Sequence, residues 1–226
     1  MSSELPKGHV ILIVGEPGTL KSTLAYALGC MAIEGKDSMG VYVTLEQTSG
    51  SLLQNVKNLK LPVKDNLVIS DLASFMIDLD TGGVKGIDEN EFFDLILENL
   101  KRPIPHQDAK VQKKPAVFIL DSINAMSALI FGDQTGMRKN LQTLLFKLKS
   151  SNITCILIME VGDLPQYHPE YFMADGIIEL GIAKTEKGKM KRFIRVRKMR
   201  YMKHSLQPFL LEASEECGIK IISELI

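Results

Sequence analysis

The sequence feature that most constrains the fold is a short apolar run that leads into a glycine-containing loop and then a helical pattern. Residues 10–14 are all apolar, which is typical of an inner strand of a parallel sheet. Residues 15–22 follow directly as Gly-Glu-Pro-Gly-Thr-Leu-Lys-Ser, and the pattern predicts a helix over residues 21–34. In this order, backbone N–H groups of the loop and of the helix start lie where they can bind phosphate oxygen atoms.

The loop matches the phosphate-binding pattern G-x-x-x-x-G-K-[ST] at all but one position. Lys21 is predicted to bind the β- and γ-phosphates of a nucleotide, and the Ser22 hydroxyl to bind Mg²⁺. Leu20 occupies the place of the second glycine, where a side chain either alters the loop geometry or crowds the nucleotide. We therefore predict nucleotide binding, with efficient hydrolysis a weaker expectation. The predicted nucleotide-binding residues are Gly15, Glu16, Pro17, Gly18, Thr19, Leu20, Lys21, Ser22 and Thr23.

Two acidic residues directly follow predicted strands. Asp121 ends the apolar run 117–120, and this position suits a second, outer-shell carboxylate for Mg²⁺. Glu46 follows the run 41–45, and its carboxylate is predicted to orient the attacking water. Because the carboxyl ends of parallel strands meet at one edge of a sheet, both acids are expected beside the phosphate loop.

Strand and helix patterns alternate through the first two thirds of the chain. They predict an α/β fold with a mostly parallel sheet flanked by helices, in one domain covering residues 1–226. After residue 175 the patterns are short strands without helices between them, so we expect antiparallel strands added at the C-terminal end. The predicted strands are 9–14, 41–45, 67–69, 117–120, 153–159, 176–180, 192–199, 208–211 and 219–222, and the predicted helices are 21–34, 48–59, 91–100 and 134–150.

The formal net charge of zero hides a charge asymmetry. Residues 184–203 contain ten Lys and Arg and one Glu, a net charge of +9, so the rest of the chain carries −9. This basic stretch favours either a nucleic-acid surface or a surface that binds the acidic face of a second copy. The apolar runs are too short to span a membrane and no basic, apolar leader begins the chain, so the composition predicts a cytoplasmic protein with no membrane partner.

The order of phosphate loop, strand-end Glu, strand-end Asp and basic tail resembles the RecA-superfamily ATPases, and most closely the KaiC-like branch. The specific match is Lys198-Met199-Arg200, then His204, then Pro208-Phe209. The resemblance implies a RecA-like phosphate-loop fold, ATP and Mg²⁺ as cofactors, and a hexameric ring. It further implies that Lys198 and Arg200 act as catalytic residues across the subunit interface, with His204 contacting the nucleotide of the neighbouring copy. Tyr201 departs from the family pattern, because a glycine usually follows Lys-Met-Arg.

Three functions remain open at this point. The favoured one is a slow, Mg²⁺-dependent ATPase that acts as a regulatory switch in a ring. The second is a DNA-binding ATPase of recombination or repair, and the third is a module that binds nucleotide without turnover. The basic stretch favours the second, although Phe193 and Tyr201 are the only aromatic residues in it. Leu20 favours the third.

Overall fold

The computed structural model describes residues 5–34, 38–72, 114–128, 134–162, 169–185, 188–216 and 218–225, and the helical positions 92, 94, 96 and 98. Within this part of the chain a nine-stranded sheet has the order β3-β2-β4-β5-β1-β6-β7-β8-β9. The strands are β1 Val10–Gly15, β2 Ser38–Thr44, β3 Leu67–Asp71, β4 Lys114–Asp121, β5 Thr154–Glu160, β6 Gly176–Lys184, β7 Met190–Met199, β8 Phe209–Ser214 and β9 Gly218–Glu224. The helices are α1 Lys21–Ala32, α2 Ser49–Asn58, α5 Ile123–Met126 and α6 Gln134–Ser150, with a 3-10 helix at Pro169–Phe172.

The sheet confirms the predicted α/β architecture. Strands β3, β2, β4, β5, β1 and β6 are parallel, and β7, β8 and β9 add antiparallel pairs. The prediction was inaccurate at one point, because β6 belongs to the parallel part and pairs with β1. The antiparallel part thus begins at β7, one strand later than expected. Strand β4 also begins earlier than predicted, at Lys114.

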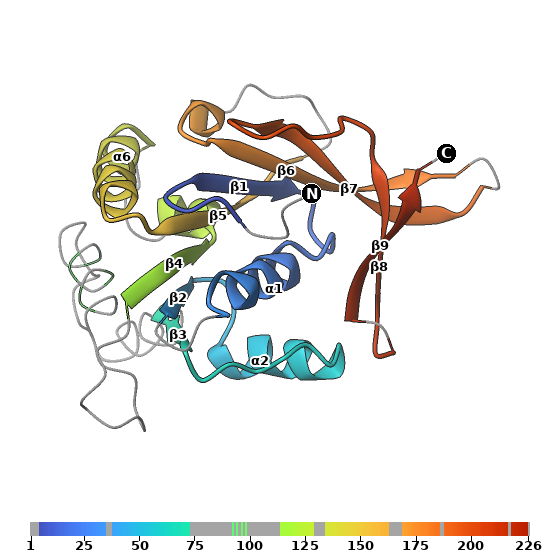
Figure 1. Cartoon of the computed structure of the whole chain (residues 1–226), viewed down its shortest axis with the longest axis horizontal. Coiled ribbons are helices and arrows are strands. Elements are labelled where there is room, and N and C mark those ends of the chain that lie inside the picture. The colour runs from blue at the N-terminus through green and yellow to red at the C-terminus, as the bar shows by residue number, and fades with distance from the viewer. Residues whose placement is uncertain are drawn as a thin grey trace.

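Helices cover both faces of the parallel strands (Figure 1): α1 and α2 lie on one face and α6 on the other. Alternation along β1 explains how one strand serves both layers. Ile11 and Ile13 pack into the core beneath α1, whereas Val10, Leu12 and Val14 pack into the core beneath α6. The strand is therefore apolar throughout, as its sequence shows. Strands β8 and β9 extend beyond these helices at the far end of the sheet (Figure 1).

Side-chain positions account for two of the predicted helices. Thr48 caps α2, because its side chain accepts a hydrogen bond from the Ser51 backbone N–H at 3.2 Å. In the predicted helix 91–100, Phe92 and Ile96 are fully buried in the core beneath α6. In the described part of the chain, no helix is both long and apolar enough to cross a membrane.

Candidate functional site

The loop between β1 and α1 has the backbone of a phosphate loop in spite of its leucine. Leu20 adopts φ 76° and ψ 27°, the left-handed conformation that glycine adopts easily, and Gly18 has φ 78°. The Leu20 side chain packs against the core beneath α1 rather than over the loop. Gly15 is required for another reason, because a Cβ atom there would lie 2.3 Å from the Leu180 carbonyl oxygen. Leu20 thus combines a left-handed backbone with a side chain that packs against the core.

Lys21 begins α1 and is buried, with 6% of its side chain exposed. Its ammonium group donates to the Glu16 carbonyl oxygen at 2.8 Å and to Glu160 Oε1 at 3.0 Å. Thr19 Oγ1 also donates to the Glu16 carbonyl, at 2.7 Å, which closes the turn of the loop. The sequence analysis did not single out Glu160. The signal that could have found it is its position as the last residue of β5, level with Gly15 of β1.

The Asp121 carboxylate lies within hydrogen-bonding reach of the Ser22 side chain. Tyr42 Oη donates to Asp121 Oδ2 at 2.7 Å, and both side chains are almost fully buried. Burial raises the pKa of Asp121, while hydrogen bonds from Tyr42 and Ser22 and the charge of Lys21 act in the opposite direction. The Tyr42 hydroxyl remains protonated, because burial and the nearby Asp121 charge raise its pKa well above the usual value.

Glu46 lies at the exposed rim of the same edge of the sheet. Its Oε1 accepts a hydrogen bond from the Ser122 hydroxyl, which also caps α5 through the Ala125 N–H. Burial of the carboxyl group raises the pKa of Glu46, and the charges of Asp121 and Glu160 raise it further. The Ser122 hydrogen bond and the charge of Lys21 oppose this shift. A carboxylate with a raised pKa at this place is suited to accept a proton near neutral pH.

The groups at this edge fit a magnesium-bound nucleotide. The first N–H groups of a helix have no partner within the helix, and α1 directs them at the loop. Apart from its chain neighbours, no atom of the described residues lies within 4 Å of the position that a Cβ atom of Gly18 would occupy, so the loop is open at this point. The Ser22 hydroxyl and the Asp121 carboxylate are hard oxygen donors of the kind that Mg²⁺ prefers.

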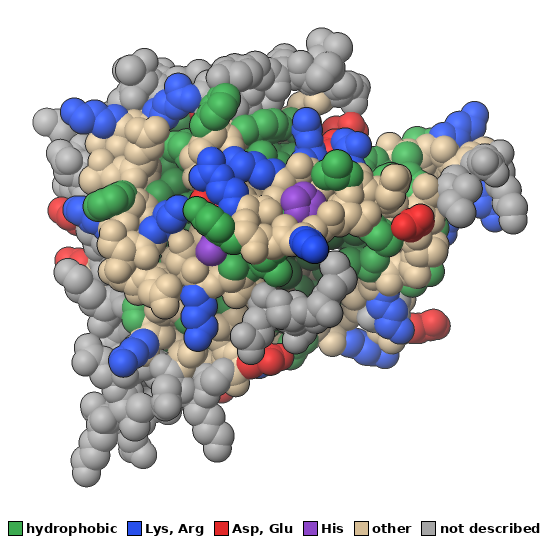
Figure 2. All heavy atoms as spheres, turned by 45° about the horizontal axis from the view of Figure 1, so that its top comes forward, with side chains coloured by type: hydrophobic (Ala, Val, Ile, Leu, Met, Phe, Trp, Pro, Cys, Tyr) green, Lys and Arg blue, Asp and Glu red, His purple; other side chains and the backbone are tan. Residues whose placement is uncertain are grey.

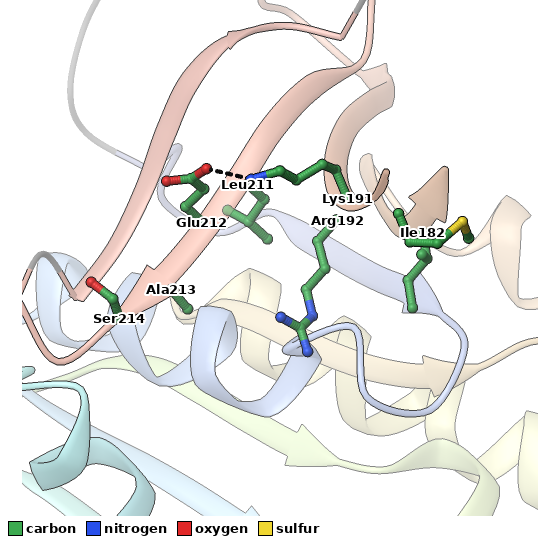
Figure 3. Close-up of a pocket in the computed structure, with 8 residues that line it drawn as sticks. Ile182, Lys191, Arg192, Leu211, Glu212, Ala213 and Ser214 are labelled. Carbon is green, nitrogen blue, oxygen red and sulfur yellow. Dashed lines mark hydrogen bonds and ion pairs between the residues drawn. The ribbon is translucent and has the colours of Figure 1, made fainter. Parts of the chain in front are cut away.

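Arg192 of β7 is a further residue at the loop that the sequence analysis did not assign. Its Nε donates to the Gly18 carbonyl oxygen at 3.0 Å. Figure 3 shows its side chain pointing to the loop before α1, whereas Lys191 points to Glu212. The two residues are adjacent on one strand, so their side chains leave opposite faces of the sheet. Arg192 reaches the loop because of the register of β7 against β6. The run of basic residues in the sequence does not predict this register, so it does not predict the contact.

Lys198 and Arg200 lie far from the loop of their own chain. Met199 on β7 pairs with Gly176 on β6, and Gly176 pairs with Ile11 on β1. Ile11 lies four residues before Gly15, where the loop begins. At about 3.3 Å per residue this separation is on the order of 13 Å along the sheet.

The side chains of Lys198 and Arg200 also have partners in their own chain. Lys198 Nζ donates to the carbonyl oxygens of Ala174 at 2.6 Å and Tyr171 at 3.2 Å.

Arg200 Nη1 pairs with Asp175 Oδ1 at 3.3 Å, while half of its own side chain is exposed. Asp175 is buried and also accepts from Lys149 Nζ at 2.8 Å and from the Val10 N–H at 3.0 Å. Burial alone would raise the pKa of Asp175, but these hydrogen bonds and the Lys149 charge outweigh it, and the pKa is lowered. Burial and the Arg200 charge lower the pKa of Lys198.

His204 and Tyr201 lie in the link between β7 and β8. His204 Nδ1 is 3.1 Å from the Met202 carbonyl oxygen. Tyr201 has φ 65° and is 89% exposed, and its ring meets the edge of His9 at a centroid distance of 5.8 Å. Like Leu20, Tyr201 thus adopts the backbone conformation expected of the glycine that it replaces.

The basic stretch is partly neutralised by acids of the same chain. Arg195 pairs with Glu179, and Lys191 pairs with Glu212 at 3.0 Å. Figure 2 nevertheless shows many Lys and Arg side chains on one face of the molecule, with hydrophobic side chains between them. This face is therefore basic but carries less free positive charge than the count of residues suggests.

The fold and this edge of the sheet define the phosphate-loop class with a RecA-like fold: a mixed sheet with helices on both faces, a loop of the phosphate-binding pattern after β1 and an aspartate at the end of β4. The chain belongs to the KaiC ATPase family, because the family profile described as "ATPase: KaiC" matches residues 1–226. Family membership implies nucleotide binding.

Individual relatives support this assignment. The chain is 28% identical over 222 residues to the circadian clock protein KaiC2 of Synechocystis sp., covering 96% of this chain and 37% of that protein. It is 26% identical over 208 residues to the circadian clock oscillator protein KaiC of Parathermosynechococcus lividus, covering 88% and 36%. The chain thus spans little more than a third of the length of these relatives. The crystal structure of a KaiC-like protein from Pyrococcus horikoshii has the same fold, with a TM-score of 0.75, 24% identity and coverage of 96% and 91%.

Proposed function

We propose that the chain binds ATP with Mg²⁺, hydrolyses it slowly, and acts as a regulatory switch in a ring of identical subunits. The observation that carries this proposal is the left-handed backbone of Leu20, at φ 76°. It supports a working phosphate loop at the single position where the motif departs from its pattern. The rest of the constellation, Lys21, Ser22, Glu46 and Asp121, lies at the same edge of the sheet.

Each residue has a role that follows from its chemistry. Lys21 neutralises the β- and γ-phosphates, and the N–H groups at the start of α1 bind their oxygen atoms. Ser22 and Asp121 hold the magnesium ion, which supplies charge neutralisation at the transferred phosphoryl group. Glu46, fixed by Ser122, orients the attacking water and accepts its proton.

Lys198, Arg200 and His204 serve the nucleotide of a neighbouring copy in this proposal. The distance of Lys198 and Arg200 from the loop of their own chain supports a role across an interface rather than within one chain. A head-to-tail contact of this kind closes into a finite ring when the rotation between copies permits it, and we propose a hexamer. Positive charge supplied across the interface stabilises the developing negative charge during hydrolysis.

The direct test is a calorimetric titration of ATP and Mg²⁺ into the wild-type chain and Lys21→Met, with phosphate release measured on both. Methionine keeps most of the side-chain volume but removes the charge. We expect binding to weaken by about 1.5–3 kcal/mol, the contribution of a charge-assisted hydrogen bond. Equal affinity in the two proteins would refute the phosphate site. Binding without phosphate release would instead support the module without turnover.

The DNA-binding alternative has its own test. Figure 2 shows the basic face that would serve it. A single-stranded oligonucleotide is titrated at several salt concentrations, because phosphate contacts give affinity that falls steeply with salt. Under the switch proposal we expect no salt-dependent binding in the micromolar range.

A further inference from the structure

The ammonium group of Lys21, the residue proposed to bind phosphate, is bound to a carboxylate. Lys21 Nζ is 3.0 Å from Glu160 Oε1, and Lys21 is 6% exposed against 38% for Glu160. Such a pair is partly shielded from water, so its attraction is stronger than that of a fully exposed pair. A phosphate oxygen that binds Lys21 in the direction of Glu160 must replace this carboxylate.

Hydrogen bonds of the Glu160 backbone hold this residue beside Lys21. Its N–H donates to Asn124 Oδ1 at 2.8 Å, and Asn124 Nδ2 donates to the Glu160 carbonyl oxygen at 3.1 Å. This reciprocal pair joins the end of β5 to α5, just after Asp121. Strand β5 is also paired to β1 with Glu160 level with Gly15. The Glu160 backbone is thus fixed on two sides, while its side chain has an exposed face into which it can turn.

The local charge balance is acidic. Glu46 is affected electrostatically by Asp121, Glu160 and Lys21. Asp121 is affected by Glu160 and Lys21. A nucleotide adds further negative charge to this group. Glu160 therefore opposes nucleotide binding in two ways, by occupying Lys21 and by repelling the incoming phosphates.

We propose that Glu160 is an affinity-determining residue that competes with the nucleotide phosphates for Lys21 and thereby weakens nucleotide binding. This inference rests on the proposed nucleotide site and adds a residue that acts through Lys21. When phosphate binds, the Lys21–Glu160 ion pair breaks and the Glu160 side chain turns toward solvent, while Asn124 keeps its backbone in place. The acid at the end of β5 thus sets how much free nucleotide is needed to fill the site.

The test is a double-mutant cycle on the full chain with Glu160→Gln and Lys21→Met, read as the dissociation constants of ADP and ATP in the presence of Mg²⁺. Glutamine keeps the shape of the side chain and removes its charge. We expect Glu160→Gln to tighten both nucleotides by roughly twofold to tenfold, the range for a partly exposed ion pair. In the Lys21→Met background, the same substitution is expected to tighten binding clearly less than in the wild type, since only the repulsion of the phosphates by Glu160 then remains.

Glu212→Gln is the matched control. It also removes the acid of a lysine pair with a 3.0 Å separation, Lys191–Glu212, but that lysine points away from the loop (Figure 3). We expect this variant to bind nucleotide like the wild type. Thermal unfolding checks that each variant folds, and Glu160→Ser provides a second charge-removing variant with the same expected direction.

The possible results distinguish failure of the Glu160 competition from failure of the proposed nucleotide site. Unchanged or weaker binding in both Glu160 variants, with Lys21→Met still weakening binding, overturns the competition and leaves the nucleotide site standing. Tightening of equal size in the Lys21→Met background also overturns it, because repulsion alone would then explain the effect. If Lys21→Met binds nucleotide as well as wild type, the proposed site and this inference both fail.

Discussion

Tyr42 and Asp121, on the neighbouring strands β2 and β4, share a buried hydrogen bond of 2.7 Å close to Ser22 at the start of α1. The tyrosine hydroxyl is the donor, since its pKa is raised well above the usual value by burial and by the aspartate charge. The bond keeps Asp121 in place beside Ser22, where the proposed magnesium site needs a carboxylate. A residue in the middle of an inner strand thus supports the chemistry at the edge of the sheet.

Tyr42→Phe removes this donor and leaves a buried carboxylate with one partner fewer. We expect the free energy of unfolding at pH 7 to fall by about 1–3 kcal/mol. The pKa of Asp121 is already raised, so stability decreases as pH rises from the usual aspartate value toward the folded value. Tyr42→Phe raises the pKa of Asp121 further. The difference in the free energy of unfolding between Tyr42→Phe and wild type should therefore shrink at low pH. Urea denaturation at several pH values measures this loss of stability. Tyr26→Phe is the control, because the Tyr26 hydroxyl donates to a backbone carbonyl, that of Pro62 at 3.2 Å.

Leu20 combines a left-handed backbone with a side chain packed against the core. Leu20→Ala keeps the backbone strain and loses the packing, so we expect it to be the least stable variant. Leu20→Gly loses the same packing but removes the strain, and it should be about 1–2 kcal/mol more stable than Leu20→Ala. Because the loop already has its left-handed turn, ATP affinity in Leu20→Gly should stay within about threefold of wild type. A much tighter affinity would show that leucine impairs the loop.

Glu46→Gln tests the proposed general base. We expect ATP binding to be retained and turnover to fall by roughly 10²–10⁴-fold. In the wild type, turnover should decrease as pH falls through the pKa of Glu46, which is raised by burial, and this inflection should be absent from Glu46→Gln. Phosphate release across a pH series measures both effects. Wild-type turnover in Glu46→Gln would leave Glu46 as a rim acid held by Ser122.

Asp175 joins the start of β1 to Lys149 and Arg200. Its folded pKa is lowered, so its contribution to stability is present above the usual aspartate pKa and is lost as pH falls through the lower folded value. Asp175→Asn is expected to cost about 1–3 kcal/mol at pH 7, and the difference from wild type should shrink as pH falls through the lowered folded pKa of Asp175. Denaturation at acid and neutral pH checks this. Glu212→Gln, which breaks a half-exposed pair, should cost less than about 1 kcal/mol.

Mixed subunits test whether Arg200 acts across an interface. Arg200→Ala and Glu46→Gln are each expected to reduce turnover when assayed alone. If catalysis is shared, mixing the two variants creates some interfaces with an intact Glu46 and an intact Arg200, and part of the activity returns. Analytical ultracentrifugation with ATP and Mg²⁺ checks assembly, which should weaken as salt rises. A protein that stays monomeric at micromolar concentration, or mixtures without recovery, would contradict the ring.

The sequence predicted the fold and the core of the candidate site because both depend on local patterns. A continuous apolar strand such as Val10–Val14 is buried on both faces wherever it lies, and a glycine loop between strand and helix has few alternative geometries. The rule that parallel strands end at one edge was enough to expect Glu46 and Asp121 near Lys21. The direction of β6 was not predictable in this way, because short strands without intervening helices usually pair antiparallel.

The sequence by itself determined which residue types stand at the strand ends, and so the class of chemistry that this edge can support. Only the tertiary structure decided that Leu20 and Tyr201 take left-handed backbones, because the path of the chain between the flanking helices and strands outweighs the preference of each residue. The structure alone also placed Glu160 and Arg192 at the phosphate loop and Asp175 against Arg200. These contacts join residues between 25 and 174 positions apart, and their partners are set by strand order and register, which no local pattern in the sequence encodes.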